Sequence, residues 1–299
     1  MTDYMKYEVK PALPVWAKIF LVLIAFIIFT GIFQVLGMLI LGIPLNHQHS
    51  LRVSISLTQQ VILSAIGLIP LALIIFTFRR FLDRRTLMSM GFSIKNRFKD
   101  ISTGFLIALF LFVGGSLILI LLNSIGITFI HFDLRSFLMS LLLFVVVALN
   151  EEILMRGYIL NNLMDSINKY WALLISAMIF SVLHSLNPNI SFLAIINLML
   201  AGIILGSSYI FTRNLWFPIS LHLFWNFFQG PVLGYSVSGL KIDSIFKVTV
   251  FGNTSVNGGQ FGFEGSIVCT ILLIPAIIMI MVYYLKFFKK SEISEVTQL

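Results

Sequence analysis

The sequence predicts an all-α, polytopic membrane protein, and two observations carry this prediction. Of its 299 residues, 59% are hydrophobic and only 11% are charged, whereas a soluble domain carries about 25% charged residues. Apolar runs of about 20 residues, the length of a bilayer-spanning helix, recur along the whole chain. We therefore expect residues 1–299 to form a single integral membrane domain.

About eight runs are candidates for transmembrane helices. They cover residues 16–43, 54–78, 101–122, 136–161, 170–186, 190–211, 215–229 and 266–288. The fourth run contains charges and the seventh is short, so their ends are the hardest to place. The first run is too long for the apolar core of a signal peptide and no small-residue cleavage site follows it. We therefore interpret it as a retained first helix.

The basic residues predict that both chain ends face the cytoplasm. Seven arginines and lysines crowd the connection over residues 79–99, and three lysines follow the last run at 286–290. With eight crossings, the opposite side carries only Arg52, Arg135, Lys241 and Lys247. Because positive charge marks cytoplasmic connections, the orientation is N-in and C-in. This uneven distribution explains the net charge of +8 through membrane topology, and we expect no nucleic-acid partner.

The connection over about 230–265 is the longest and is rich in glycine. It follows the segment of about 136–229, where the polar residues of interest lie. Phe246 to Phe251 are apolar and β-branched, and Asn257-Gly258 supplies the backbone conformation of a tight turn. The sequence therefore favours an ordered outer loop with a hairpin, although a flexible connector fits the composition equally well.

Two adjacent acids, Glu151 and Glu152, are the only ones placed well inside a predicted span. An ionisable side chain at bilayer depth costs a few kcal/mol (order of magnitude), so the pair needs a reason to be there. Neighbouring helical residues point about 100° apart, whereas residues four apart share a face. Glu152 can therefore pair with Arg156, which leaves Glu151 unpaired as a candidate general base. The alternative is that both glutamates form one electrostatic brace.

His184, His222 and Asn226 are three further candidate site residues within the predicted spans. His184 precedes the helix breaker Asn187-Pro188-Asn189, and taken alone it reads as an interior histidine with a satisfied hydrogen bond. His222 and Asn226 are four residues apart on the seventh helix, so both tips share a face and could donate to a developing oxyanion. The alternative for this pair is that it holds helices together.

Several protease chemistries are excluded at the level of motifs. No His-Glu-x-x-His and no Gly-x-Ser-x-Gly occurs, and the predicted spans contain no aspartate for an aspartyl mechanism. The single cysteine, Cys269, permits no intramolecular disulfide. We expect it to be a small core residue.

Three motifs, Glu-Glu-x-x-x-Arg, Phe-x-x-x-His and His-x-x-x-Asn, occur intact and in this order between Glu151 and Asn226. Together they resemble the CPBP family, which comprises type II CAAX prenyl endopeptidases and bacteriocin-processing proteins. The resemblance implies an intramembrane endopeptidase that hydrolyses a peptide bond of a membrane-associated peptide or protein. It implies that Glu151 and His184 activate water and that His222 and Asn226 hold the oxyanion. The supporting residues that it implies are Glu152, Arg156 and Phe180.

Three expectations remain open at the level of sequence. No cofactor is favoured, but zinc is possible, and its ligands would be Glu151, His184 and His222. The alternative to an enzyme is a non-catalytic membrane scaffold or bacteriocin-immunity protein that binds a peptide or partner. The location expected from the resemblance is a bacterial cell membrane.

The predicted helix ends place Glu151 and His184 at different depths in the bilayer, which conflicts with a single catalytic site that contains both. At 1.5 Å per residue, Glu151 lies about 22 Å from the outer start of its helix, while His184 lies about 21 Å from the inner start of the next. These depths would not meet unless the helices tilt or the fifth span starts deeper in the bilayer.

Overall fold

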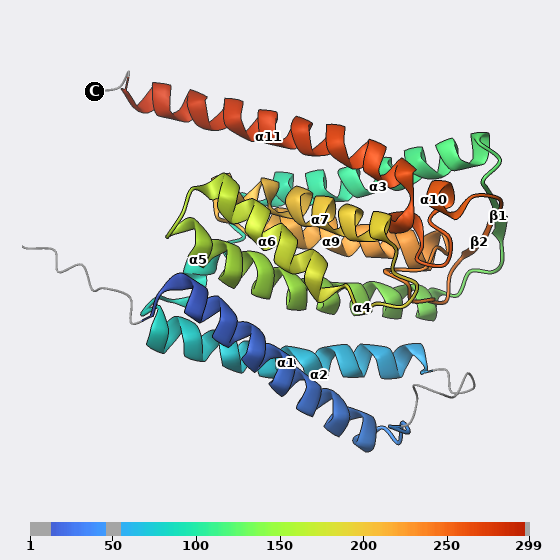
Figure 1. Ribbon diagram of the computed structural model, residues 1–299, viewed down its shortest axis with the longest axis horizontal. Coiled ribbons are helices and arrows are strands. Elements are labelled where there is room, and N and C mark those ends of the chain that lie inside the picture. The colour runs from blue at the N-terminus through green and yellow to red at the C-terminus, as the bar shows by residue number, and fades with distance from the viewer. Residues whose placement is uncertain (1–12, 46–54, 297–299) are drawn as a thin grey trace, which may run out of the picture.

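The computed structural model describes residues 13–45 and 55–296. Long apolar helices lie side by side along one direction, and a small two-stranded sheet closes one end of the bundle (Figure 1). Arg52, which entered the charge argument, and residue 54, the predicted start of the second span, lie outside the described residues.

The longer helices follow the predicted order of apolar runs. In chain order they are α1 (Val15–Ile40), α2 (Leu57–Thr77), α3 (Phe98–Leu121), α4 (Leu134–Glu152), α6 (Lys169–Leu183), α7 (Phe192–Ser207), α9 (Trp216–Phe227) and α11 (Ile267–Val296). The short helices are α5 (Asn161–Met164), α8 (Tyr209–Thr212) and α10 (Thr254–Asn257), and the strands are β1 (Ile125–Phe129) and β2 (Phe246–Val250). Segments of π-helix continue α2 over Phe78–Leu82, α4 over Ile153–Leu160 and α9 over Phe228–Val232, and 3₁₀ turns occupy Leu87–Met90 and Phe263–Gly265.

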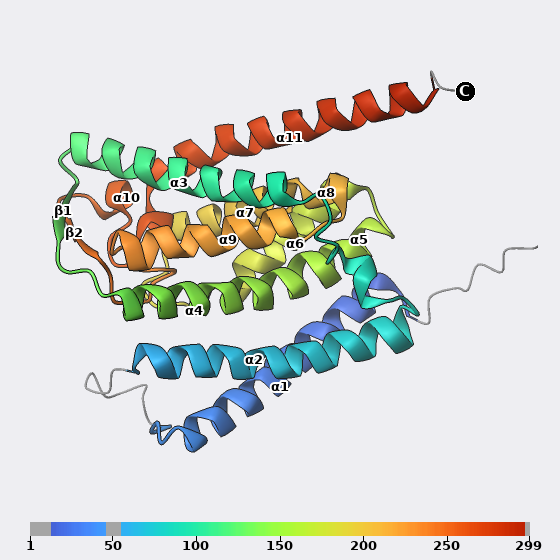
Figure 2. The ribbon, with the colours of Figure 1, turned by 180° about the vertical axis from the view of Figure 1, so that it is seen from behind.

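The all-α, polytopic membrane fold is confirmed, but the number of eight spans is not. Within the described residues, six helical stretches are long and apolar enough to cross a membrane. The other two predicted spans, α6 and α9, contain 15 and 12 residues, fewer than the roughly 20 that a perpendicular crossing requires. Both pack against the long helices, α6 against α7 and α9 against α3 (Figure 2).

Helix packing divides the molecule into two parts. Helix α1 packs on α2, and α2 packs on α4, so this pair borders the rest of the bundle. In the larger part α3 packs on α9, α6 on α7, and α11 across α7 and α3. Large apolar side chains of α1 such as Trp16 and Ile40 are exposed, as expected for a helix that faces lipid. The residues predicted to form the site lie on α4, at the end of α6 and on α9, which belong to the larger part.

Helix α1 begins and helix α11 ends at the same end of the bundle (Figure 1). This is the end at which the basic connection after α2 lies, and Lys18 and Arg79 there both contact the carboxylate of Asp83, at 2.7 and 3.2 Å. The arrangement agrees with an even number of crossings. The sheet and the long loop lie at the opposite end, which the charge pattern predicts to be the outer one.

The predicted hairpin in the outer loop is wrong, although its strand exists. Strand β2 pairs antiparallel with β1, from Ile125 opposite Val250 to Phe129 opposite Phe246. Asn257-Gly258 ends the short helix α10, with Gly258 at a φ of 85°. The Asn-Gly pair thus supplies the expected positive φ, but at a helix end rather than in a β-turn. The loop is held by a partner more than a hundred residues earlier in the chain.

We expect both chain ends to lie in the cytoplasm and the 230–265 loop to lie outside. A green fluorescent protein fused to the C-terminus should therefore fluoresce, and alkaline phosphatase inserted at the exposed Gly252 should be active, because each reporter works on one side of the membrane only. Phosphatase fused to the C-terminus is the matched control and should be inactive. The reverse pattern would contradict the orientation.

Candidate active site

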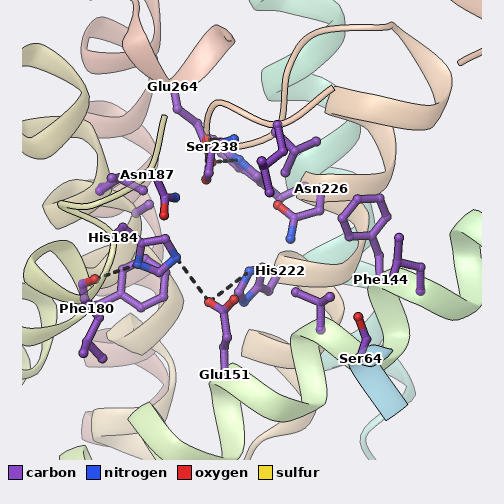
Figure 3. A pocket seen from close by; sticks show the side chains of 18 of the residues that line it. Ser64, Phe144, Glu151, Phe180, His184, Asn187, His222, Asn226, Ser238 and Glu264 are labelled. Carbon is purple, nitrogen blue, oxygen red and sulfur yellow. Dashed lines mark hydrogen bonds and ion pairs between the residues drawn. The ribbon is translucent and has the colours of Figure 1, made fainter. Parts of the chain in front are cut away.

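Glu151 and Glu152 close the last turn of α4 but face different surroundings. The side chain of Glu151 is 32% exposed, whereas that of Glu152 is fully buried. This is the separation of about 100° that the helix imposes on neighbours. Glu151 points into a cavity of about 920 Å³, where Figure 3 shows its carboxylate between two histidines.

His184 lies at the end of α6, and its position is set by the preceding turn. Its Nδ1 is 2.8 Å from the carbonyl oxygen of Phe180, and the two rings lie 4.5 Å apart. Because a carbonyl only accepts, Nδ1 carries the proton. Nε2 of the neutral ring is then an acceptor, and it lies 3.6 Å from Oε2 of Glu151.

His222 reaches the same carboxylate from α9. Its Nδ1 lies 2.7 Å from Oε1 of Glu152, and its Nε2 lies 3.8 Å from Oε2 of Glu151. The buried Glu152 therefore orients this ring, as a backbone carbonyl orients His184. Both imidazoles turn Nε2 toward one oxygen of Glu151, at distances too long for direct hydrogen bonds.

Glu152 also forms the predicted pair with Arg156. Nη1 of Arg156 donates to Oε1 of Glu152 at 2.8 Å, and Nη2 donates to the carbonyl of Gly202 at 3.1 Å. The guanidinium lies over the ring of Phe180, 4.9 Å from its centre, where the face of the ring attracts a cation. The pair forms although the chain turns from α-helix to π-helix between the two residues.

Asn226 follows His222 by one helical turn and lines the same cavity. Figure 3 shows its amide pointing into the space between the histidines and the outer loop. The amide makes no hydrogen bond to any residue within 13–45 and 55–296, so it is available to a bound molecule. The structure thus brings Glu151, His184, His222 and Asn226 together, with Glu152, Arg156 and Phe180 behind them.

The conflict of depths disappears because α4 and its continuation are longer than predicted. The helical stretch runs from Leu134 to Met164, and α6 begins at Lys169. From the inner end, Glu151 is then about 20 Å along the first helix and His184 about 22 Å along the second. The predicted end of the fourth span at residue 161 was too early, because the polar Asn161 and Asn162 are buried in the structure rather than placed in a connection.

The cavity is largely apolar and draws its walls from distant parts of the chain. Its lining residues include Phe26 and Ile27 of α1, Leu63 of α2, and Phe144 and Val147 of α4. Such a lining suits a hydrophobic chain or an apolar peptide segment.

Three polar cavity residues of the outer loop, Ser238, Lys241 and Glu264, were not predicted as site residues. Glu264 is an acid in the glycine-rich run after Asn257, and its placement outside every span removed it from consideration. Its burial to 5% exposure depends on tertiary packing. Cys269 is buried, as expected, and is not among the cavity residues.

The three possible zinc ligands match a zinc site in kind. Two imidazole nitrogens and a carboxylate converge, and each imidazole is oriented by a second hydrogen bond, as in many metal sites. In the described part of the chain, however, no group of three such side chains is arranged to hold an ion.

Part of the chain is similar to a known protein family. Residues 133–228 match a family model described as Type II CAAX prenyl endopeptidase Rce1-like. This segment begins just before α4 and ends just after α9, and so contains all three motifs. Neither the curated proteins nor the solved structures contain a significant match to the chain.

We expect Glu152→Gln to destabilise the protein far more than Glu151→Gln. The first change leaves Arg156 as a buried cation without its carboxylate, which costs on the order of 3–5 kcal/mol, whereas the partly exposed Glu151 has no such partner. Thermal unfolding of both purified variants, together with their abundance in membranes, measures the difference. Equal losses in the two variants would contradict this division.

Proposed function

We propose that the chain is a glutamate-type intramembrane endopeptidase of the CPBP family, because residues 133–228 match the Rce1-like family model. Its substrate is a membrane-associated peptide or protein that enters the cavity from the bilayer. One observation carries the proposal: Nε2 atoms of His184 and His222 lie 3.6 and 3.8 Å from Oε2 of Glu151.

The first step is the activation of water by Glu151 and His184. Oε2 of Glu151 is buried and has no hydrogen-bond partner among the described residues, and Nε2 of His184 is an acceptor. A water between them donates one hydrogen to each group. Its oxygen attacks the peptide carbonyl carbon as Glu151 takes the proton.

The second step is the stabilisation of the oxyanion and the departure of the amine. The amide of Asn226 donates to the oxyanion. His222 donates through Nε2 only as an imidazolium, because its Nδ1–H is used by Glu152. Since Glu151 is protonated at this stage, the carboxylate of Glu152 and the oxyanion itself supply the compensating negative charge. Glu151 then returns its proton to the amine nitrogen as the carbon–nitrogen bond breaks.

The membrane setting supports this chemistry. Within the apolar cavity, a fixed carboxylate and fixed hydrogen-bond donors act more strongly than in water. The apolar walls from α1 and α2 would hold the hydrophobic part of a membrane-associated substrate.

We expect Glu151→Gln to lower the cleavage rate by about 10²-fold to 10⁴-fold, the usual contribution of a general base. The assay uses the purified protein in liposomes with an internally quenched peptide ending in a farnesylated Cys-a-a-X sequence, and the same peptide without the lipid. Comparison of the two peptides measures the requirement for a prenyl group. Asp243→Asn removes an exposed acid of the outer loop and should leave the rate unchanged.

Equal rates in the wild type and Glu151→Gln would contradict the enzymatic proposal. If, in addition, cells carrying Glu151→Gln kept the full biological output of the protein, a scaffold or immunity function would be favoured. The wild type and Glu151→Gln must be equally abundant in the membrane for this comparison.

A tight chelator should leave cleavage unchanged if Glu151 and His184 activate water directly. Metal analysis of the purified protein should then find no stoichiometric zinc. If Glu151, His184 and His222 instead bind zinc, chelation should abolish cleavage and added zinc should restore it, because the bound water would lose its lowered pKa without the metal. One zinc per chain together with this loss and recovery would overturn the metal-free mechanism.

A further inference from the structure

A tight turn at residues 237–240 forms the wall of the cavity that faces Glu151. Val237 and Leu240 exchange backbone hydrogen bonds of 2.8 and 2.9 Å. The two central residues, Ser238 and Gly239, have φ angles of 47° and 87°, as in a type I′ turn. Figure 3 shows Ser238 across the cavity from Glu151, so a molecule bound at Glu151 would meet this turn on its other side.

The carboxylate of Glu264 holds the turn in place. Its Oε2 accepts hydrogen bonds from the backbone N–H and the hydroxyl of Ser238, at 3.0 and 2.9 Å. Its Oε1 accepts one from Nε1 of Trp225 at 3.0 Å. No lysine or arginine of the described chain forms an ion pair with Glu264, so these three donors compensate a carboxylate that is only 5% exposed. Hydrogen bonds to an ionised group are about twice as strong as neutral ones.

The backbone that carries Glu264 is itself fixed. The amide of Asn197 on α7 donates to the carbonyls of Glu264 and Ser266, at 2.7 and 2.8 Å. Gly262 passes so close to the 236 carbonyl that a Cβ on it would lie 2.0 Å from that oxygen. The absence of a side chain at Gly262 therefore allows the two loop backbones to touch. The carboxylate of Glu264 projects from this rigid support.

Glu264 also connects the turn to the helix that carries the oxyanion donors. Trp225 directly precedes Asn226 on α9, and its ring packs edge-on against Phe112 of α3 at 4.9 Å. The hydrogen bond from Trp225 thus ties the loop to the helical turn that aims Asn226 into the cavity. One side chain joins two walls of the same cavity.

We propose that Glu264 is a positioning residue that fixes the 237–240 turn at a set distance from Glu151 and Asn226, so that the turn presses a bound peptide against the reacting groups. The claim that the turn presses on a bound peptide rests on the proposed function. The claim that Glu264 fixes the turn does not depend on it.

Whether Glu264 fixes the turn is tested by the rate at which a cysteine placed in the turn reacts with a thiol reagent. In a Cys269→Ala background, Val237→Cys provides a single thiol at a position that is 8% exposed. Adding Glu264→Gln should raise its rate of labelling by a maleimide about tenfold, the effect of losing one hydrogen bond to a charged group. Asp243→Asn removes an acid from the same loop without touching these bonds, and should leave the rate unchanged.

Two milder variants guard against misfolding of Glu264→Gln. Ser238→Ala removes one donor and keeps the backbone N–H, while Trp225→Phe removes the other side-chain donor and keeps an aromatic ring. Each should raise the labelling rate in the same direction by a smaller factor. An unchanged labelling rate in both variants would overturn the claim that Glu264 fixes the turn.

The effect on the substrate is tested with the farnesylated, internally quenched peptide. Glu264→Gln should raise KM about tenfold, and Ser238→Ala should raise KM by a smaller factor, because the turn binds the peptide. In both variants kcat should change by less than about twofold, because the turn does not touch the reacting atoms. A loss of folded protein would instead lower the apparent kcat at an unchanged KM, and that result overturns the positioning role.

The two proposals fail in different ways. Equal hydrolysis by wild type and Glu151→Gln removes the proposed function, while the labelling experiment still decides whether Glu264 holds the turn. Normal cleavage by wild type with unchanged labelling and KM in the Glu264 and Ser238 variants removes only the positioning role.

Discussion

The fully buried carboxylate of Glu152 is the interaction on which the rest of the site depends. It accepts from Arg156 at 2.8 Å and from His222 at 2.7 Å. Arg156 in turn donates to the Gly202 carbonyl on α7 and lies over Phe180 on α6. Four helices are therefore joined through one ionised group, and these contacts offset part of the cost of placing a charge in hydrocarbon.

This arrangement also decides what the neighbouring acid can do. Because Glu152 uses Arg156 and orients His222, Glu151 keeps a carboxylate without a fixed partner at the cavity surface. The backbone carbonyl of Phe180 orients His184 in the same way that Glu152 orients His222. Two different acceptors thus leave the same nitrogen, Nε2, free on both rings. One turn of helix supplies a structural acid and an acid available for chemistry.

The outer end of the site is built by a different means. The bundle supplies Glu151 and the histidines from helices, whereas the opposite wall comes from the long loop after α9. Pairing of β1 with β2 anchors this loop to the end of α3, and Glu264 anchors it to α9. Loops placed on a rigid scaffold commonly carry binding residues. Under the proposed function, changes in this loop alter which peptides fit the cavity.

The sequence by itself determined the membrane class, the order of the apolar helices, the pairing of Glu152 with Arg156 and the separate face of Glu151. These follow from local rules, since helical periodicity and the cost of charge in a bilayer act on neighbouring residues. Tertiary structure decided that α4 continues to Met164, which brings Glu151 level with His184, and that His222 is the second partner of Glu152. It also decided that β2 pairs with β1 and that Glu264 is buried beside the cavity. Each of these depends on contacts between segments far apart in the chain, whose geometry no local pattern records.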